Sequence, residues 1–212
     1  MARPRYLSPI APIGLVCILG LAGLGQIGPA LSAEEEHLRL GDPGALPPAR
    51  AEAIYQGVKG AMADGYAPSR DPIAKNYPSW RRFNVAPYLS ATHGNRYANN
   101  FANDKAVRAG YGRLKAGQKM PAGAVVVKDS YTVTKEGEVF PGALFIMEKL
   151  APGRGPDTGD WRFVQILPDG SYIGDTTGDS PEDVAFCFTC HKAMAGVDYL
   201  FFLPEAYRLK QK

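Results

Sequence analysis

Two cysteines and a histidine near the end of the chain have the types and the spacing of a cofactor site. Two residues separate Cys187 from Cys190, and His191 follows directly. Thiols three positions apart on a helix lie about one turn from each other, so both can add to vinyl groups of one porphyrin. The neighbouring imidazole can then bind the iron. The pattern therefore predicts a covalently attached haem c, with His191 as the metal ligand.

Other uses of a cysteine pair fit the sequence less well. A redox-active dithiol is expected beside a βαβ unit, and the chain shows no such pattern. A structural zinc ion needs four ligands, and the other candidates are His37 and His93 once a leader carrying the third cysteine, Cys17, is removed. With so few cysteines, a scaffold held by disulfides is not expected.

The first part of the chain has the three-part layout of a secretory signal peptide. Arg3 and Arg5 precede an apolar, glycine-rich stretch at 10–25, which small residues separate from the acidic run 34–36. We expect cleavage that removes residues 1–33 and places the protein in the periplasm. The alternative is an uncleaved membrane anchor, but prolines and glycines shorten the continuous apolar run below the roughly 20 residues that span a bilayer.

The remaining chain has the composition of one globular domain. Of the 212 residues, 45% are hydrophobic and 21% are charged, and the formal net charge is +3. Such a balance excludes the strongly basic surface that binds nucleic acid or anionic lipid. Residues 34–47 carry glycine and proline without an apolar period and predict a flexible extension, so the domain itself is expected at 48–212.

Periodicity within this domain predicts helices beside an antiparallel sheet. The clearest strand is 124–134, where alternation puts Val126, Lys128 and Ser130 on one face. Tight turns are expected at 135–137 and 168–170. Further extended segments are expected at 80–89, 93–101, 143–150, 161–167 and 171–173. Helices are expected at 49–63, from Asp104 as cap to about 114, and from Ser180 as cap through 187–195, with no regular structure in the proline-rich stretch 66–79.

The residue on the other side of the iron decides between electron transfer and small-molecule chemistry. Candidate sixth ligands are His93, Met147 and Met194, and each has a simpler explanation. His93 fits a polar residue at a strand end, Met147 fits a core residue, and Met194 lies in the helix of the haem motif. We therefore expect an open distal site.

Several segments occur in the order found in a known group of haem proteins. They are Arg96 within HGNRYANNFAN, GAVVVKD at 123–129, FIMEK at 145–149, GDWRFVQIL at 159–167 and CFTCHK at 187–192. In this order the chain resembles the cytochrome P-460 family and its relatives, the β-sheet cytochromes c-prime. The four-helix cytochromes c-prime share a haem motif near the C-terminus, but the strand at 124–134 does not suit a helical bundle.

The resemblance implies an α+β domain, mainly antiparallel sheet with flanking helices, and a haem c held by Cys187, Cys190 and His191. Some members of the family oxidise hydroxylamine and carry a lysine joined to the porphyrin edge, and the matching position here is Lys128. Lys128 is also the charged residue on its strand face, which requires a polar partner or a cofactor if that face is buried. The alternative is a lysine on a solvent-facing surface. Arg96 matches a distal arginine of the family, able to hydrogen-bond a ligand or a haem propionate.

Glu148 is the candidate general base, provided that the strand face it shares with Leu144 and Ile146 lines the haem pocket. Otherwise it is a strand carboxylate paired with Lys149 or another cation. Three functions remain open: oxidation of hydroxylamine with electrons leaving to a partner cytochrome, binding of nitric oxide or another diatomic gas, and electron transfer alone. A homodimer is compatible with each of them.

Overall fold

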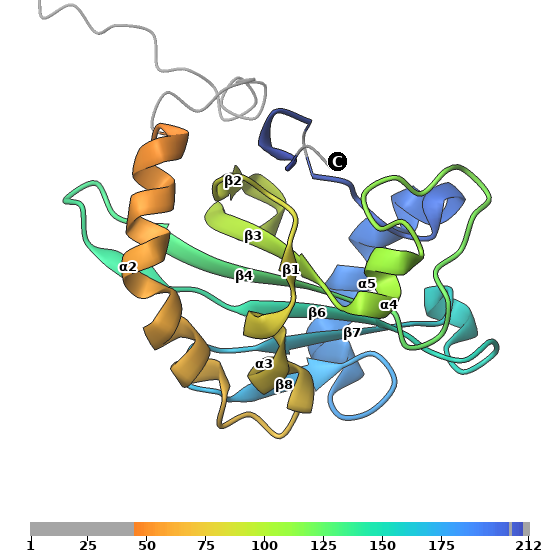
Figure 1. Ribbon diagram of the computed structural model, residues 1–212. Coiled ribbons are helices and arrows are strands. Elements are labelled where there is room, and N and C mark those ends of the chain that lie inside the picture. Colours follow the sequence, from red (N-terminus) through yellow and green to blue (C-terminus); the bar gives the residue numbers. More distant parts are fainter. Residues whose placement is uncertain (1–44, 204, 210–212) are drawn as a thin grey trace, which may run out of the picture. The chain divides into compact units, whose positions relative to one another are not determined.

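A computed structural model describes residues 45–203 and 205–209 of the chain (Figure 1). The expected signal peptide at 1–33, Cys17 and most of the expected extension at 34–47 lie outside the described residues. Within the described ranges, no helix is long and apolar enough to cross a membrane.

The domain is built on an eight-stranded sheet in which every neighbouring pair is antiparallel. Its main path runs β1-β3-β4-β6-β7-β8, while β2 pairs with β3 and β5 pairs with β4. The strands are β1 (Arg81–Arg82), β2 (Tyr88–Ser90), β3 (Arg96–Ala102), β4 (Val125–Val133), β5 (Val139–Pro141), β6 (Leu144–Lys149), β7 (Trp161–Ile166) and β8 (Tyr172–Asp175). The antiparallel sheet and its flanking helices confirm the α+β prediction.

The strands follow the β-branched and aromatic segments of the sequence. The segment 124–134 forms β4 almost as predicted, and the segments at 143–150 and 161–167 form β6 and β7. β5 was not predicted, because a short stretch ending in proline gives a weak strand signal. The turn expected at 135–137, with Gly137 at φ +89°, makes this stretch double back along β4.

Helix α2 (Pro48–Tyr66) confirms the expectation at 49–63, with proline in its first turn where no N–H is needed. The expectation of irregular chain at 66–79 is wrong. A short helix, α3 (Pro72–Asn76), and the 3-10 turn η1 (Tyr77–Ser79) form there. Asp71 caps α3 by accepting a hydrogen bond from the backbone N–H of Ile73, so Pro72 starts this helix and does not prevent it.

Two other helix boundaries differ from the sequence prediction. Asn103 caps α4 (Asp104–Arg108) in place of Asp104, and this helix ends well before 114. Ser180 has φ +47° and its side chain caps nothing. The expected single helix after it is three pieces, namely η4 (Pro181–Val184), α5 (Ala185–His191) and η5 (Lys192–Val197). Further 3-10 turns are η2 (Ala91–His93), η3 (Pro156–Thr158) and η6 (Glu205–Tyr207).

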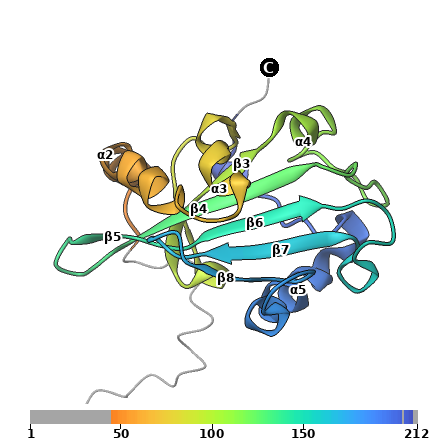
Figure 2. The same cartoon turned by 90° about the horizontal axis from the view of Figure 1, so that it is seen from below.

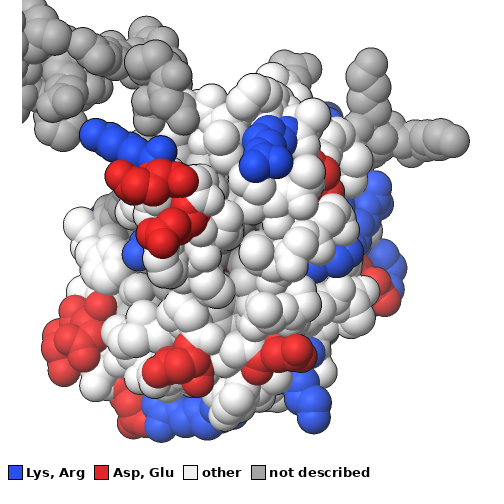
Figure 3. Space-filling view, turned by 90° about the vertical axis from the view of Figure 1, so that its left-hand side faces the viewer, with Lys and Arg blue, Asp and Glu red and all other residues white. Residues whose placement is uncertain are grey.

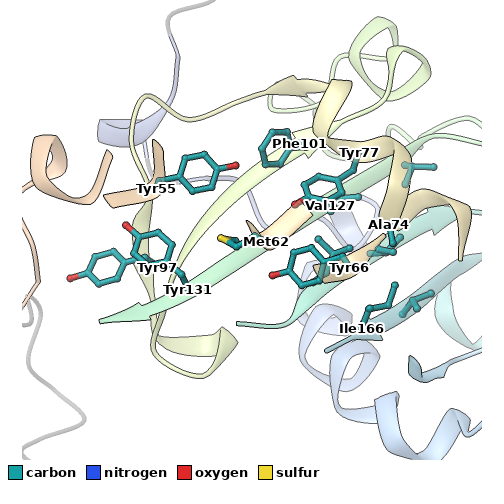
Figure 4. Close-up of a cluster of buried hydrophobic side chains, with 14 of the residues drawn as sticks. Tyr55, Met62, Tyr66, Ala74, Tyr77, Tyr97, Phe101, Val127, Tyr131 and Ile166 are labelled. Carbon is teal, nitrogen blue, oxygen red and sulfur yellow. The ribbon is translucent and has the colours of Figure 1, made fainter. Parts of the chain in front are cut away.

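The two faces of the sheet pack against different elements, as Figures 1 and 2 show. On one face, α2 and α3 cover a core rich in tyrosine (Figure 4), which includes Tyr55, Met62, Tyr66, Tyr77, Tyr97, Phe101, Val127, Tyr131, Leu144, Ile146 and Ile166. On the other face, residues of α4 and α5 join a second core, which includes Ala106, Tyr111, Val126, Met147, Trp161, Phe163, Cys187 and Phe188. Alternate side chains of the central strands therefore pack into two separate cores, one on each face of the sheet.

The surface carries charges of both signs. In the view of Figure 3, Lys and Arg side chains lie among Asp and Glu side chains, separated by uncharged residues. This mixture agrees with the small net charge of the sequence.

Candidate functional site

A cavity of about 390 Å³ lies on the sheet face opposite α2. Its walls come from β3, β4, β6 and β7, from α5, and from the chain after η5. The lining residues that matter for chemistry are His93, Arg96, Asn100, Tyr111, Lys128, Phe145, Met147, Phe163, Cys187, Cys190, His191 and Phe201. All the residues predicted from the haem motif, together with Arg96 and Lys128, thus meet around one cavity.

The helix α5 brings Cys187, Cys190 and His191 to this cavity. Both cysteines are free thiols, and Cys187 is partly buried. Burial raises the pKa of the Cys187 thiol to about 11, so it is present as the neutral thiol at neutral pH. Two free thiols one helical turn apart at the wall of a cavity suit attachment of a porphyrin.

His191 has the protonation pattern of a metal ligand. Its Nδ1 lies 2.7 Å from the backbone oxygen of Tyr199, which can only accept, so Nδ1 carries the proton. Nε2 then keeps the lone pair that an iron ion needs. Burial lowers the pKa of His191 to about 4, which keeps the imidazole neutral. The residues present therefore fit a haem iron.

Lys128 lies in the middle of β4, opposite Asn100 of β3 and Phe145 of β6. Burial lowers the pKa of its ammonium group to about 8, while the nearby Cys190 acts in the opposite direction. The described residues provide its Nζ with no hydrogen-bonding partner. Lys128 is therefore a partly neutral amine beside the cysteine pair, and it does not lie on a solvent-facing surface.

His93 and Arg96 form another part of the wall. His93 Nδ1 lies 2.9 Å from the hydroxyl of Ser90, and its ring packs edge-on against Phe145 with centroids 5.0 Å apart. Arg96 Nη1 donates to the His93 carbonyl at 3.2 Å. Burial, with Lys128 and His191 nearby, lowers the pKa of His93 to about 2. Of the other candidate sixth ligands, Met147 lines the cavity and Met194 does not.

Glu148 is not part of the cavity, so the condition on which its role as general base depended is not met. Phe145 and Met147 present their side chains to the cavity, while Glu148 lies on the face of β6 that packs toward α3. Its Oε2 accepts a hydrogen bond from Arg162 Nη1 at 2.7 Å. The alternative interpretation, a strand carboxylate paired with a cation, is the correct one, with Arg162 as the cation in place of Lys149.

Sequence reasoning missed a hydrogen-bonded chain in the wall. Tyr88 donates to Asn100 Oδ1 at 3.0 Å, and Asn100 Nδ2 donates to the Tyr111 hydroxyl at 2.9 Å. Two consecutive asparagines, Asn99 and Asn100, in the middle of a strand were the available signal, because asparagine is depleted in strands. Their side chains point to opposite faces of the sheet, and the side chain of Asn100 lines the cavity.

The fold and the site together define a class: an antiparallel α+β domain with a haem motif on a short helix at one face of its sheet. The family model of cytochrome P460 matches residues 74–202, and the chain belongs to the cytochrome P460 family. It is therefore a haem c protein. No curated protein sequence matches the chain. The described residues contain no group of three or more His, Cys, Asp or Glu side chains placed to hold a metal ion, and His37, a candidate ligand of the zinc alternative, lies outside them.

Proposed function

We propose that this protein is a periplasmic haem c oxidoreductase that oxidises hydroxylamine or a similar small nitrogen compound. In this proposal the haem is attached through Cys187 and Cys190 and joined at its edge to Lys128. The observation that carries the proposal is the position of Lys128, a partly neutral amine in the same cavity as the cysteine pair. The signal peptide expected at 1–33 supports a periplasmic location, where a partner cytochrome would take up the electrons.

When bound, haem c supplies an iron that takes a small ligand and exchanges electrons with it. The chain's own residues then hold and orient the reactants. His191 would hold the iron through Nε2, because the Tyr199 carbonyl fixes the proton on Nδ1. Arg96 offers guanidinium donors to a polar ligand, and Phe145 and Phe163 limit the access of water.

Neutral His93 replaces Glu148 in the proposed arrangement. Its low pKa keeps the imidazole uncharged, so that it can accept a hydrogen bond from an N–H or O–H group of the ligand. The contact with Ser90 and the edge-on packing against Phe145 fix the plane of the ring. His93 thus orients the ligand, and Arg96 holds the adjoining backbone carbonyl.

The lysine link is tested by mass spectrometry of a digest of the holoprotein. We expect one haem peptide that contains both the Cys187 and the Lys128 segments, together with sustained hydroxylamine oxidation when an artificial electron acceptor is supplied. Lys128→Met should lose the link and most of the turnover while keeping haem on the cysteines. Lys115→Met, in an exposed loop, is the matched control and should retain both. A wild-type haem peptide without the Lys128 segment would contradict the proposal.

A second candidate function is the binding of nitric oxide without turnover. It is favoured by the described lining of the cavity, which includes aromatic side chains and no Asp or Glu to accept protons. Here the expected result is tight nitric oxide binding with no steady-state consumption of hydroxylamine. Sustained turnover would exclude this candidate.

A further inference from the structure

The backbone beneath the haem-motif histidine has an unusual conformation. Asp198 and Tyr199 have φ angles of +56° and +64°, and the Tyr199 carbonyl is the acceptor for His191 Nδ1. Two consecutive non-glycine residues rarely adopt the left-handed region, and they stay there only when the surrounding structure holds them. The backbone N–H groups of Asp198 and Tyr199 donate to the Ala195 and Met194 carbonyls at the end of η5, and contacts from other elements also hold the Tyr199 carbonyl in place.

Asp198 makes these contacts, through three acceptors bonded to three other parts of the domain. Lys149 Nζ donates to Oδ1 at 2.6 Å, the backbone N–H of Met120 donates to Oδ2 at 2.7 Å, and Trp161 Nε1 donates to the Asp198 carbonyl at 2.9 Å. Lys149 is 5% exposed and Asp198 is 3% exposed. A buried ion pair, together with Trp161, thus holds Asp198, the residue next to Tyr199, where β6 ends and β7 begins.

The ring of Tyr199 is also held in place by residues near this ion pair. Lys149 Nζ also donates to the Gly159 carbonyl at 2.8 Å and lies 4.9 Å from the centroid of the Trp161 ring. A Cβ atom on Gly159 would lie 2.0 Å from Tyr199 Cε2, so the ring packs directly on the glycine backbone. Both the backbone and the side chain around the Tyr199 peptide are consequently held by the end of β6, the start of β7 and the connection between them.

We propose that Lys149, Asp198 and Trp161 are positioning residues for the proximal ligand. They fix the Tyr199 carbonyl against His191 Nδ1, and this hydrogen bond makes the imidazole a stronger electron donor to the iron. The inference rests on the part of the proposed function that makes His191 the iron ligand. It depends neither on hydroxylamine oxidation nor on the link to Lys128.

The test compares Lys149→Met with the wild-type holoprotein by resonance Raman spectroscopy of the reduced haem and by redox titration. We expect the iron–histidine stretching band to move to lower frequency and the midpoint potential to rise. A weaker hydrogen bond to Nδ1 makes the imidazole a poorer donor, which weakens the iron–nitrogen bond and stabilises ferric iron less. The matched control is Glu148→Gln, which breaks an ion pair on the neighbouring residue of the same strand and should leave band and potential unchanged.

Asp198→Asn provides a second variant if Lys149→Met does not fold, because it keeps an oxygen for Met120 N–H while removing the charge that pairs with Lys149. It should shift the band in the same direction. A folded variant with a lowered Tm but a wild-type band and potential would show that the ion pair is merely structural and overturn the inference. Absence of an iron–histidine band in the wild type would overturn the role of His191 as well. Shifted bands without any hydroxylamine turnover would support the inference while the proposed reaction fails.

Discussion

Lys128 and Asp129 are neighbours in β4 that point to opposite faces of the same sheet, and both are ionisable groups away from bulk water. Asp129 is 1% exposed and accepts hydrogen bonds from Tyr55, Tyr77 and Asn99 under α2. Lys128 faces the cavity without such partners. On the α2 face three donors surround the Asp129 carboxylate, whereas on the cavity face the described residues give the Lys128 amine no comparable hydrogen-bonding partner.

The same contrast holds for apolar residues. Ile146 is 1% exposed and packs in the tyrosine-rich core, whereas Phe145, one position away, is half-buried and packs edge-on against His93 at the cavity wall. Ile146 is packed by other side chains of the domain, whereas Phe145 faces the cavity in which the haem would lie. Stability should therefore depend mainly on the α2 face and haem chemistry on the other.

Substitution of Ile146 and of Phe145 should show the largest difference between the two faces. Ile146→Ala should lower the free energy of unfolding of the holoprotein by about 3 kcal/mol, because it leaves a void in a packed core. Phe145→Ala should instead change the optical spectrum of the haem, because its side chain faces the cavity, whereas Ile146→Ala should leave that spectrum unchanged. Guanidinium unfolding curves measure the first effect and absorption spectra the second, and equal spectral changes for the two variants would contradict the contrast between the faces.

The buried carboxyl group should make stability depend on pH. Burial raises the pKa of Asp129 from 3.8 to about 6, so the folded state binds more protons than the unfolded state between these values. Its stabilising contribution is therefore complete below pH 4 and is lost as the pH rises through 6. Relative to Asp129→Asn, the wild type should lose on the order of 2–3 kcal/mol between pH 4 and pH 7.

Unfolding at both pH values measures this loss. The exposed Asp157 provides a control, because Asp157→Asn should show the same pH dependence as the wild type. Parallel pH profiles for the wild type and Asp129→Asn would mean that the buried carboxyl group does not titrate in this window.

Removal of the carboxylate from Glu148 should have the smallest effect. Glu148→Gln should change hydroxylamine turnover by less than about twofold and stability by about 1 kcal/mol or less, since the ion pair with Arg162 is partly exposed. Arg162 also keeps its contact with Asp71. Steady-state kinetics and an unfolding curve measure the two effects. A large loss of turnover in a stable variant would show that Glu148 takes part in the reaction.

Local patterns predicted the strands that build the site. The alternation in 124–134 correctly placed Lys128 on the opposite face of the strand from Val127 and Asp129. The cysteine spacing correctly indicated a haem protein. Alternation does not say which face meets which partner, and both faces of β6 are apolar enough to be buried. The proposed role of Glu148 failed for this reason, since it required the face carrying Leu144 to line the cavity.

Tertiary contacts decided the remaining differences. The side chain of Asn103 accepts hydrogen bonds from the backbone N–H groups of Ala106 in α4 and Val125 in β4. A capping rule considers the helix alone, so it could not show that the contact with β4 favours Asn103 over Asp104 as the cap. The contacts of Lys149 with Asp198 join residues 49 positions apart. Sequence periodicity carries no information on such pairs, and for that reason Lys149 was considered only as a surface partner for Glu148.

Helix α2 has a practical consequence for anyone who divides this chain into fragments. It precedes residue 74, where the family match begins, yet its Tyr66 is fully buried and donates to the Gly142 carbonyl. Near its end, a Cβ atom on Gly65 would lie 2.2 Å from the Pro168 oxygen, so helix and hairpin touch backbone to backbone. A fragment cut to the matched residues would expose Tyr131, Leu144 and Ile166 to solvent and should aggregate. The shortest soluble version of this domain must therefore begin before residue 48.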